Sequence, residues 1–189
     1  LKAHIEKHSK DKLYELSRLK AAHSDFGDPP PYNWVKKIGQ SSSDNVYDII
    51  SDSEGNVYIC GELSGNLDFF GQDITAISSH DGFIAKLDIN GNLIWIRQIT
   101  GSVESDIIIS DMTIDENDNI FITGYFNTSD LKIGNLTFDL VGKTDLFVAR
   151  MNKDGDFIWS KTTGQEQAVF QANEIFSNNS HIFIMINDR

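Results

Sequence analysis

Short runs of alternating apolar and polar residues, separated by turns rich in Gly, Asn and Asp, cover most of the chain after residue 32. Two such runs flank Asn90-Gly91 in the segment GFIAKLDINGNLIWIRQITG, and two more flank Asp154-Gly155 in LFVARMNKDGDFIWSKTTG. Alternation with a period of two indicates strands that bury one face. Asn-Gly and Asp-Gly supply the positive φ angles of a tight turn, so both segments are expected to form β-hairpins.

The whole pattern repeats along the chain. Trp34, Trp95 and Trp159 occupy equivalent places and lie 61 and 64 residues apart. Two further strands are expected before each hairpin, over 46–51 and 56–63 in the first copy and over 109–114 and 119–126 in the second. A third copy reaches a strand over 181–186. The sequence therefore predicts an all-β protein with about two and a half four-stranded units of roughly 62 residues, which is typical of β-propeller blades.

The first 31 residues have a different pattern. Residues 1–22 contain no Gly or Pro and place Ile5, Leu13, Leu16 and Leu19 at helical spacing, so an amphipathic N-terminal α-helix is expected. The run GDPPP over 27–31 ends it, because proline lacks a backbone donor and favours extended geometry before it. The expected organisation is a helical leader with a Pro-rich linker over 1–31 and a partial propeller over 32–189, with units 33–94, 95–158 and an incomplete 159–189.

The repeated residues resemble the SBBP-type bacterial β-propeller repeat, over about residues 33–189. That repeat runs roughly as G…D…D-x-x-G-N-x-Y-x-x-G followed by D-x-F-x-A-K-x-D-x-x-G-x-x-x-W. The first unit follows it with Asp52–Asn56, Tyr58 and Gly61, and then with Asp81, Phe83, Ala85, Lys86, Asp88, Gly91 and Trp95. The second unit departs from it with Phe121 for Tyr, Arg150 for Lys, Asn152 for Asp and Asp118 for the turn Gly. The resemblance implies a secreted or cell-surface bacterial protein and no common catalytic chemistry.

Two and a half units are fewer than the four to eight blades that close a propeller. We therefore expect further blades, either from a longer chain of which these residues are a part or from other copies of the chain. The segment 34–39, WVKKIG, is expected to be a strand that pairs with one of these additional segments.

The net charge of −12 argues against nucleic acid and anionic membranes as partners, because an acidic surface repels phosphate. No apolar run reaches the roughly 18 residues that a transmembrane segment needs. The single cysteine, Cys60, lies in the apolar run VYIC, so we expect a buried side chain and no disulfide within the chain.

The acidic turns raise the question of calcium. Asp115, Asn117 and Asn119 match the first alternating ligand positions of an EF-hand loop, but Ile120 stands where that loop needs Gly and Phe126 where it needs Glu. These three residues are weak candidate metal ligands. Tight turns require the same residue types, so we expect the protein to bind no cofactor, with calcium as the alternative.

No catalytic residue is assigned, because the chain has no nucleophile elbow, no phosphate-binding Gly loop and no paired Cys motif. Asp48 and Asp111 occupy equivalent inner-strand positions and could form a ring of carboxylates at a central channel. The three tryptophans favour packing between blades over a surface that stacks on sugars.

The expected function is therefore a non-catalytic, secreted or cell-surface β-propeller that serves as an interaction scaffold for a protein or glycan partner. Two alternatives stay open. One is an enzyme with an active site at the propeller channel, since a fold alone does not decide function. The other is a purely structural component of a larger surface assembly.

Overall fold

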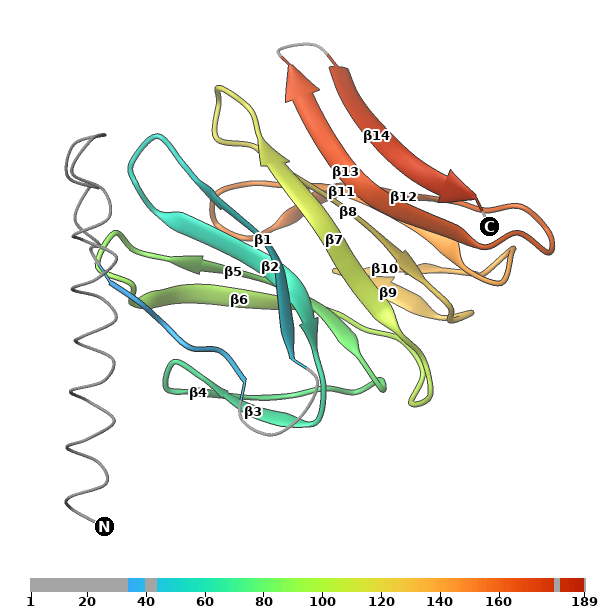
Figure 1. The fold of residues 1–189 in the computed structure, drawn as a ribbon, viewed down its shortest axis with the longest axis horizontal. Coiled ribbons are helices and arrows are strands. Elements are labelled where there is room, and N and C mark those ends of the chain that lie inside the picture. The colour runs from blue at the N-terminus through green and yellow to red at the C-terminus, as the bar shows by residue number, and fades with distance from the viewer. Residues whose placement is uncertain (1–33, 40–43, 179–180, 189) are drawn as a thin grey trace, which may run out of the picture. The chain divides into compact units, whose positions relative to one another are not determined.

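The computed structural model describes residues 34–39, 44–178 and 181–188, and the regular elements in these ranges are all β-strands (Figure 1). The all-β prediction is therefore confirmed for the described part of the chain. The predicted N-terminal helix and the linker lie outside the described residues. Residues Lys36–Arg189 form one compact unit.

Two four-stranded antiparallel sheets follow one another along the chain, and a two-stranded sheet follows them. The first sheet has the order β1-β2-β5-β6, with β1 (Asn45–Ser51), β2 (Val57–Leu63), β5 (Asp81–Leu87) and β6 (Leu93–Ile99). The second sheet has the order β7-β8-β11-β12, with β7 (Ile107–Ile114), β8 (Ile120–Phe126), β11 (Asp145–Met151) and β12 (Phe157–Thr163). The third sheet consists of β13 (Phe170–Asn178) and β14 (His181–Asp188).

Each four-stranded sheet also carries a small hairpin that the sequence pattern did not predict. The first is β3 (Asn66–Phe69) with β4 (Gln72–Thr75), and the second is β9 (Leu131–Ile133) with β10 (Leu136–Phe138). Their strands are only three or four residues long, too short for an alternation to stand out among the surrounding Gly, Asn and Asp residues. In the first hairpin, the ring of Phe69 lies 5.4 Å from the ring of Phe83 on β5.

The segment 34–39 forms no strand within the described residues, and its pairing with an additional segment stays a prediction. A strand needs a neighbouring backbone that accepts and donates ladder hydrogen bonds. Within the described residues, no other segment is paired with 34–39 in a ladder.

The three sheets pack face to face in chain order. The first strand of each sheet lies at the contact, with β7 against β1 and β13 against β7, and Figure 1 shows these three strands side by side. Apolar residues of the first and second sheets meet in a single core cluster that includes Tyr58, Ile84, Ile109, Met112 and Phe147. Face-to-face stacking of successive four-stranded sheets is the blade-like arrangement that the repeats predicted.

The first strand of every sheet carries a β-bulge at the same position. The register shifts between Val46 and Asp48 in β1, between Ile109 and Asp111 in β7, and between Ala172 and Glu174 in β13. Because the bulges coincide, the ladders define equivalent positions in the three sheets. These positions are Val46, Ile109 and Ala172; Asp48, Asp111 and Glu174; Ile49, Met112 and Ile175; Ile50, Thr113 and Phe176; Tyr58, Phe121 and Phe183; and Cys60, Thr123 and Met185.

Gly61 and Gly124 face these bulged strands from β2 and β8. A Cβ atom on Gly61 would lie 1.9 Å from the carbonyl oxygen of Asn45, and one on Gly124 would lie 1.9 Å from that of Ile108. Any side chain at either position would displace the bulged strand. The glycines of the YICG and FITG runs are therefore required by a close approach of two backbones.

The two predicted hairpins form, although their turns differ from the expectation of two positive φ angles. In the first turn, Gly91 N–H donates to Asp88 O over 2.9 Å and Asp88 N–H donates to Asn92 O over 2.8 Å. Only the glycine has a positive φ, of 80° for Gly91 and 83° for Gly155. This pattern is a type I turn followed by a glycine bulge, one residue longer than the tightest hairpin loop.

We expect Gly91→Val to lower the free energy of unfolding by more than about 1 kcal/mol, because a β-branched residue resists a positive φ. Asn90→Ala is the matched control, since Asn90 is exposed in the same turn and has a negative φ. Thermal and urea unfolding measure both variants. Equal stability of Gly91→Val and the parent would contradict the turn geometry.

Candidate functional site

Four turns of the two large sheets share one set of hydrogen bonds. Their first residues are Asp52, Asp88, Asp115 and Asn152, and each side chain accepts from the backbone N–H groups two and four residues further on, over 2.7–3.1 Å. The fourth residue of each turn has a positive φ and is Gly in three cases and Asp118 in the other. A polar first residue and a left-handed fourth residue together explain why Asp, Asn and Gly recur at this spacing.

The three weak metal candidates belong to one of these turns. The carboxylate of Asp115 accepts from the backbone N–H groups of Asn117 and Asn119 over 2.9 Å, and from the side-chain amide of Asn119 over 2.8 and 3.0 Å. Burial opposes ionisation of Asp115, but the hydrogen bonds from Asn119 and Asn117 outweigh it and lower its pKa. The amide oxygen of Asn119 accepts from Arg150 Nη2 over 2.8 Å. These oxygens thus contact N–H donors within the protein.

In the described ranges, no group of three or more His, Cys, Asp or Glu side chains is placed to hold a metal ion. Cys60 is buried, and burial raises the pKa of its thiol well above the usual value. Neither observation adds a ligand to the Asp115 turn.

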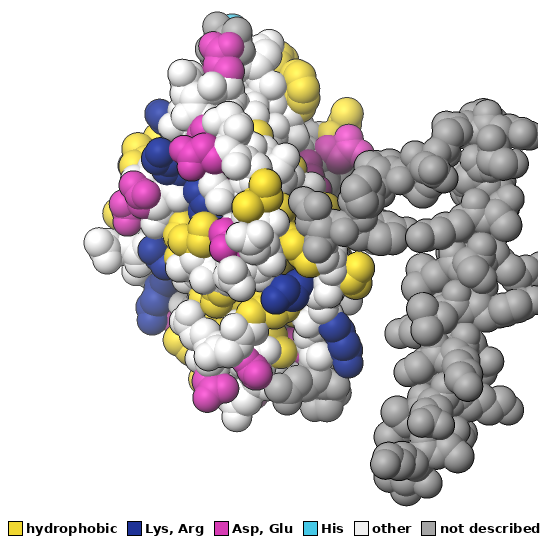
Figure 2. Space-filling view, turned by 90° about the vertical axis from the view of Figure 1, so that its left-hand side faces the viewer, with side chains coloured by type: hydrophobic (Ala, Val, Ile, Leu, Met, Phe, Trp, Pro, Cys, Tyr) yellow, Lys and Arg dark blue, Asp and Glu magenta, His cyan; other side chains and the backbone are white. Residues whose placement is uncertain are grey.

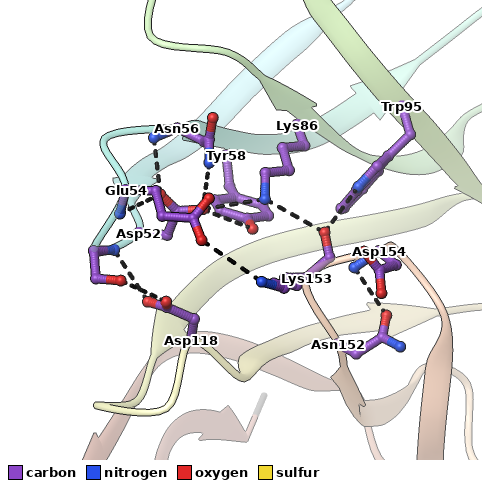
Figure 3. Close-up of polar contacts among 11 residues, drawn as sticks. Asp52, Glu54, Asn56, Tyr58, Lys86, Trp95, Asp118, Asn152, Lys153 and Asp154 are labelled. Carbon is purple, nitrogen blue, oxygen red and sulfur yellow. Dashed lines mark hydrogen bonds and ion pairs between the residues drawn. The ribbon is translucent and has the colours of Figure 1, made fainter.

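A buried ion pair lies at the contact between the first two sheets (Figure 3). Lys86 Nζ on β5 lies 3.1 Å from Asp52 Oδ2 and 5.0 Å from the centroid of the Tyr58 ring. The Tyr58 hydroxyl donates to the same carboxylate over 3.2 Å. Burial opposes the charge of Asp52, but hydrogen bonds from Asn56 and Lys86 outweigh it and hold the pKa of this carboxyl below its usual value. Burial, with the nearby charge of Asp52, raises the pKa of Tyr58.

The same side of the first sheet binds the turn Asn152–Asp156 of the second sheet. The Lys153 carbonyl accepts from Trp95 Nε1 over 3.1 Å and from Lys86 Nζ over 3.4 Å, as Figure 3 shows. Arg97 donates through Nε to the Gly155 carbonyl over 3.0 Å and through Nη2 to the Asp154 carbonyl over 3.2 Å. We call Lys86, Trp95 and Arg97 the turn-binding site.

Gly155 is required here for a second reason besides its positive φ. A Cβ atom at Gly155 would lie 3.0 Å from the ring of Trp95. The indole, only 8% exposed, therefore packs against the turn backbone itself. The structure places Trp95 between the sheets, as the packing interpretation of the tryptophans expects.

The second sheet has an equivalent site that no turn covers in the described part of the chain. Its residues are Arg150, Trp159 and Lys161, at the positions of Lys86, Trp95 and Arg97. Trp159 is half-buried, and its ring lies 6.2 Å from that of Phe121. The buried Nε atom of Arg150 has no hydrogen-bond partner among the described residues. The sequence alone gave Trp95 and Trp159 the same environment, and the structure gives them different ones.

The first strands carry a row of carboxylates, which we call the acid row: Asp48, Asp111 and Glu174. Asp48 Oδ2 accepts from Met112 N–H over 3.2 Å, and Asp111 Oδ2 accepts from Ile175 N–H over 2.6 Å. Each of the two aspartates thus bonds to the first strand of the following sheet. The sequence reading found the first two acids and missed Glu174, although the 63-residue spacing that separates Asp48 from Asp111 also leads to it.

Asp111 is the carboxyl group most altered by this arrangement. Its burial raises its pKa to about 6, with a contribution from Asp48, whereas the hydrogen bonds from Ile175 and Met112 act in the opposite direction. A pKa of about 6 makes Asp111 a candidate for acid–base chemistry near neutral pH.

A groove of about 630 Å³ lies between the first two sheets at their outer strands. Residues of β6, of the β9–β10 hairpin and of β12 line it, among them Arg97, Lys132, Asn135 and Trp159. Its lining also includes the amide of Gln98, the carboxylate of Asp156 and the aromatic residue Phe157. On another face, acidic, basic and apolar side chains are interspersed, as Figure 2 shows, so the negative net charge does not gather in one patch there.

Comparison with known proteins relates two segments of the chain to a known repeat. The model of the SBBP β-propeller repeat matches residues 33–68 and 94–132. These two segments match the SBBP repeat. Both begin at the segment that contains Trp34 or Trp95 and run through the first two strands of the following sheet. The resemblance predicted from the sequence is thereby confirmed.

Part of the chain is also similar to a curated protein. The chain is 28% identical over 126 residues to an uncharacterized WD repeat-containing protein of Acanthamoeba polyphaga mimivirus. The alignment covers 57% of this chain and 9% of the viral protein's length. Among the described residues, no helix has the length and apolar character that crossing a bilayer requires.

We expect Trp95→Ala to cost about 3–5 kcal/mol of unfolding free energy, because it removes a buried indole and leaves the Lys153 carbonyl with only the longer hydrogen bond from Lys86. Trp159→Ala is the matched control at the equivalent but open position, and its cost should be clearly smaller. Equilibrium denaturation measures both. Equal losses would show that turn binding does not stabilise the SBBP repeats.

The raised pKa of Asp111 predicts a pH dependence with a definite sign. Its carboxyl binds a proton more tightly in the folded chain than in the unfolded one, so its stabilising contribution is present below about pH 4 and is lost as pH rises through about 6. We expect the melting temperature to fall between pH 4.5 and 7, corresponding to about 1–2 kcal/mol.

Asp111→Asn should flatten this slope relative to the parent. Asp88→Asn is the control, because the pKa of that exposed carboxyl is lowered by hydrogen bonds from Asn92 and so cannot titrate in this window. Melting curves across the pH range measure all three proteins. An unchanged slope in Asp111→Asn would assign the effect to other groups.

Proposed function

We propose that these repeats form part of a non-catalytic β-propeller that serves as an interaction scaffold for a protein or glycan partner. By the SBBP resemblance, we place it outside the cell or on the surface of a bacterium. The observation that carries the proposal is the use of the polar side chains. Asp52, Lys86, Arg97 and Asp115 bind other parts of the same fold, which leaves turns and grooves, rather than a catalytic cluster, for contact with partners.

The groove between the sheets is the proposed ligand-binding surface. Phe157 offers an aromatic ring, and Lys132 and Asn135 offer polar groups from the β9–β10 hairpin. Concave sites with an apolar wall and a few polar groups are the usual places for small ligands and sugars. The WD repeat-containing relative is compatible with a scaffold, because repeat proteins present extended surfaces to their partners.

An enzyme is the second candidate, and one observation favours it. Asp111 lies beside Asp48 and has a pKa of about 6, within the range in which carboxyl groups act as general acids. Such an enzyme would use the acid row, whereas the scaffold would use the groove. The two candidates therefore predict opposite effects for variants in the two places.

The deciding experiment compares the parent chain, the acid-row variant Asp48→Asn/Asp111→Asn and the groove variant Lys132→Ala/Asn135→Ala. Each is tested on a glycan array, on a displayed peptide library and with chromogenic glycosides, esters and peptides. We expect bound ligands to be retained by the acid-row variant and weakened at least tenfold by the groove variant, with no turnover above the buffer blank. Turnover that disappears only in the acid-row variant would replace the scaffold with an enzyme.

A further inference from the structure

Each sheet of the stack has a rear face, which contacts the preceding sheet through two apolar positions of its first strand. In the second and third sheets these positions are buried: Ile109 is 0% exposed, Met112 3%, Ala172 2% and Ile175 6%. Their equivalents in the first sheet are Val46 and Ile49, which are 45% and 60% exposed. The rear face of the first sheet therefore carries the same kind of apolar residues as the buried rear faces, but exposes a large part of them to solvent.

The opposite, front face of each sheet contacts the following sheet. In the first sheet it carries Tyr58 and Cys60, both 0% exposed, and Thr123 at the equivalent place in the second sheet is also buried. The third sheet has Phe183 and Met185 at these positions, 54% and 64% exposed. Phe176 adds to this surface, because it pairs with Phe183 across the ladder and the two rings lie 6.3 Å apart.

The hydrogen bond that links one sheet to the next also has an unused acceptor in the third sheet and an unused donor position in the first sheet. Glu174 holds the acid-row position in the third sheet, and in the part of the chain that the structure describes its exposed carboxylate makes no hydrogen bond. Ile49 N–H holds the donor position that Met112 and Ile175 hold in the other sheets, and it donates to its own neighbour Asp48 over 2.7 Å. An acceptor thus lies on the front face and its matching donor on the rear face.

We propose that the exposed front face of β13–β14 binds the rear face of β1 in a second copy of this chain. In this contact Phe176, Phe183 and Met185 cover Val46 and Ile49 of the second copy, and Glu174 accepts from its Ile49 N–H. The contact continues the packing found between the three sheets, with the same register and the same type of hydrogen bond. Apolar surfaces of this kind on a soluble domain mark interaction sites.

The proposed contact joins different surfaces of the two copies, so association is head to tail and yields closed rings or open chains. It does not depend on the groove or on the proposed scaffold function. An isologous contact is distinguishable from it, because pairing of two β14 edges would leave β1 unused.

Sedimentation velocity of the full chain, alone and in mixtures, tests the proposal. Front-face variant Met185→Asp and rear-face variant Ile49→Asp each introduce a charge into one side of the contact. We expect the parent to self-associate at concentrations up to about 100 µM, and each variant alone to associate at least tenfold more weakly. An equimolar mixture should form heterodimers and nothing larger, because one intact front face and one intact rear face remain.

Glu174→Ala should weaken association of the parent roughly tenfold, as expected for loss of a charged hydrogen-bond acceptor. Ile77→Asp is the control, since Ile77 is 58% exposed between β4 and β5 and belongs to neither face. Far-ultraviolet circular dichroism verifies that every variant is folded.

Three outcomes would overturn the proposal. They are a monomeric parent at the highest concentration, continued self-association of Ile49→Asp alone, and a mixture of folded front-face and rear-face variants that stays monomeric. The second outcome would indicate an isologous contact through β14.

Discussion

The structure depends on one constraint, which is that each sheet has two apolar faces and cannot cover either by itself. Successive sheets solve this by stacking, so that the residues of one front face meet those of the next rear face. Burial of apolar surface supplies most of the favourable free energy of such a contact. The stability of a repeat therefore comes as much from its neighbours as from its own hydrogen bonds.

Polar groups determine how the sheets meet. The acid row connects the first strand of one sheet to the backbone of the next, and the turn-binding site connects the outer strands to the following turn. In both cases a side chain satisfies a backbone group that the sheet ladders leave unpaired at a bulge or a turn. A buried backbone group without a partner is costly, so these links also disfavour other registers between the sheets.

The use of polar side chains within the fold also bears on function. Charged side chains that could bind a ligand or catalyse a reaction, such as Asp52, Lys86 and Asp115, bind other groups of the fold. The surfaces that remain open to a partner are the groove and the exposed apolar faces at the two ends of the stack. The match to the SBBP repeat and the similarity to a WD repeat-containing protein agree with an architecture that works by presenting surfaces. Repetition explains the end faces, because every unit carries the contact residues whether or not a neighbour is present.

The sequence by itself determined the local structure. Alternating residues predicted the long strands, and the Asp, Asn and Gly spacing predicted their turns, because both depend on interactions between residues a few positions apart. The resemblance to the SBBP repeat and the repeat period followed from the same motifs. The small hairpins escaped prediction because three-residue strands carry too little pattern.

Only the tertiary structure decided what each repeated residue does. Trp95 and Trp159 occupy the same place in their repeats. A turn of the next sheet covers Trp95, whereas Trp159 is only half-buried. Asp111 has a pKa of about 6 because burial and Asp48 act on it together. Glu174 belongs to the acid row only because a bulge in β13 places it at the equivalent position. These properties depend on which surface lies opposite a side chain, and residues more than 50 positions away supply that surface.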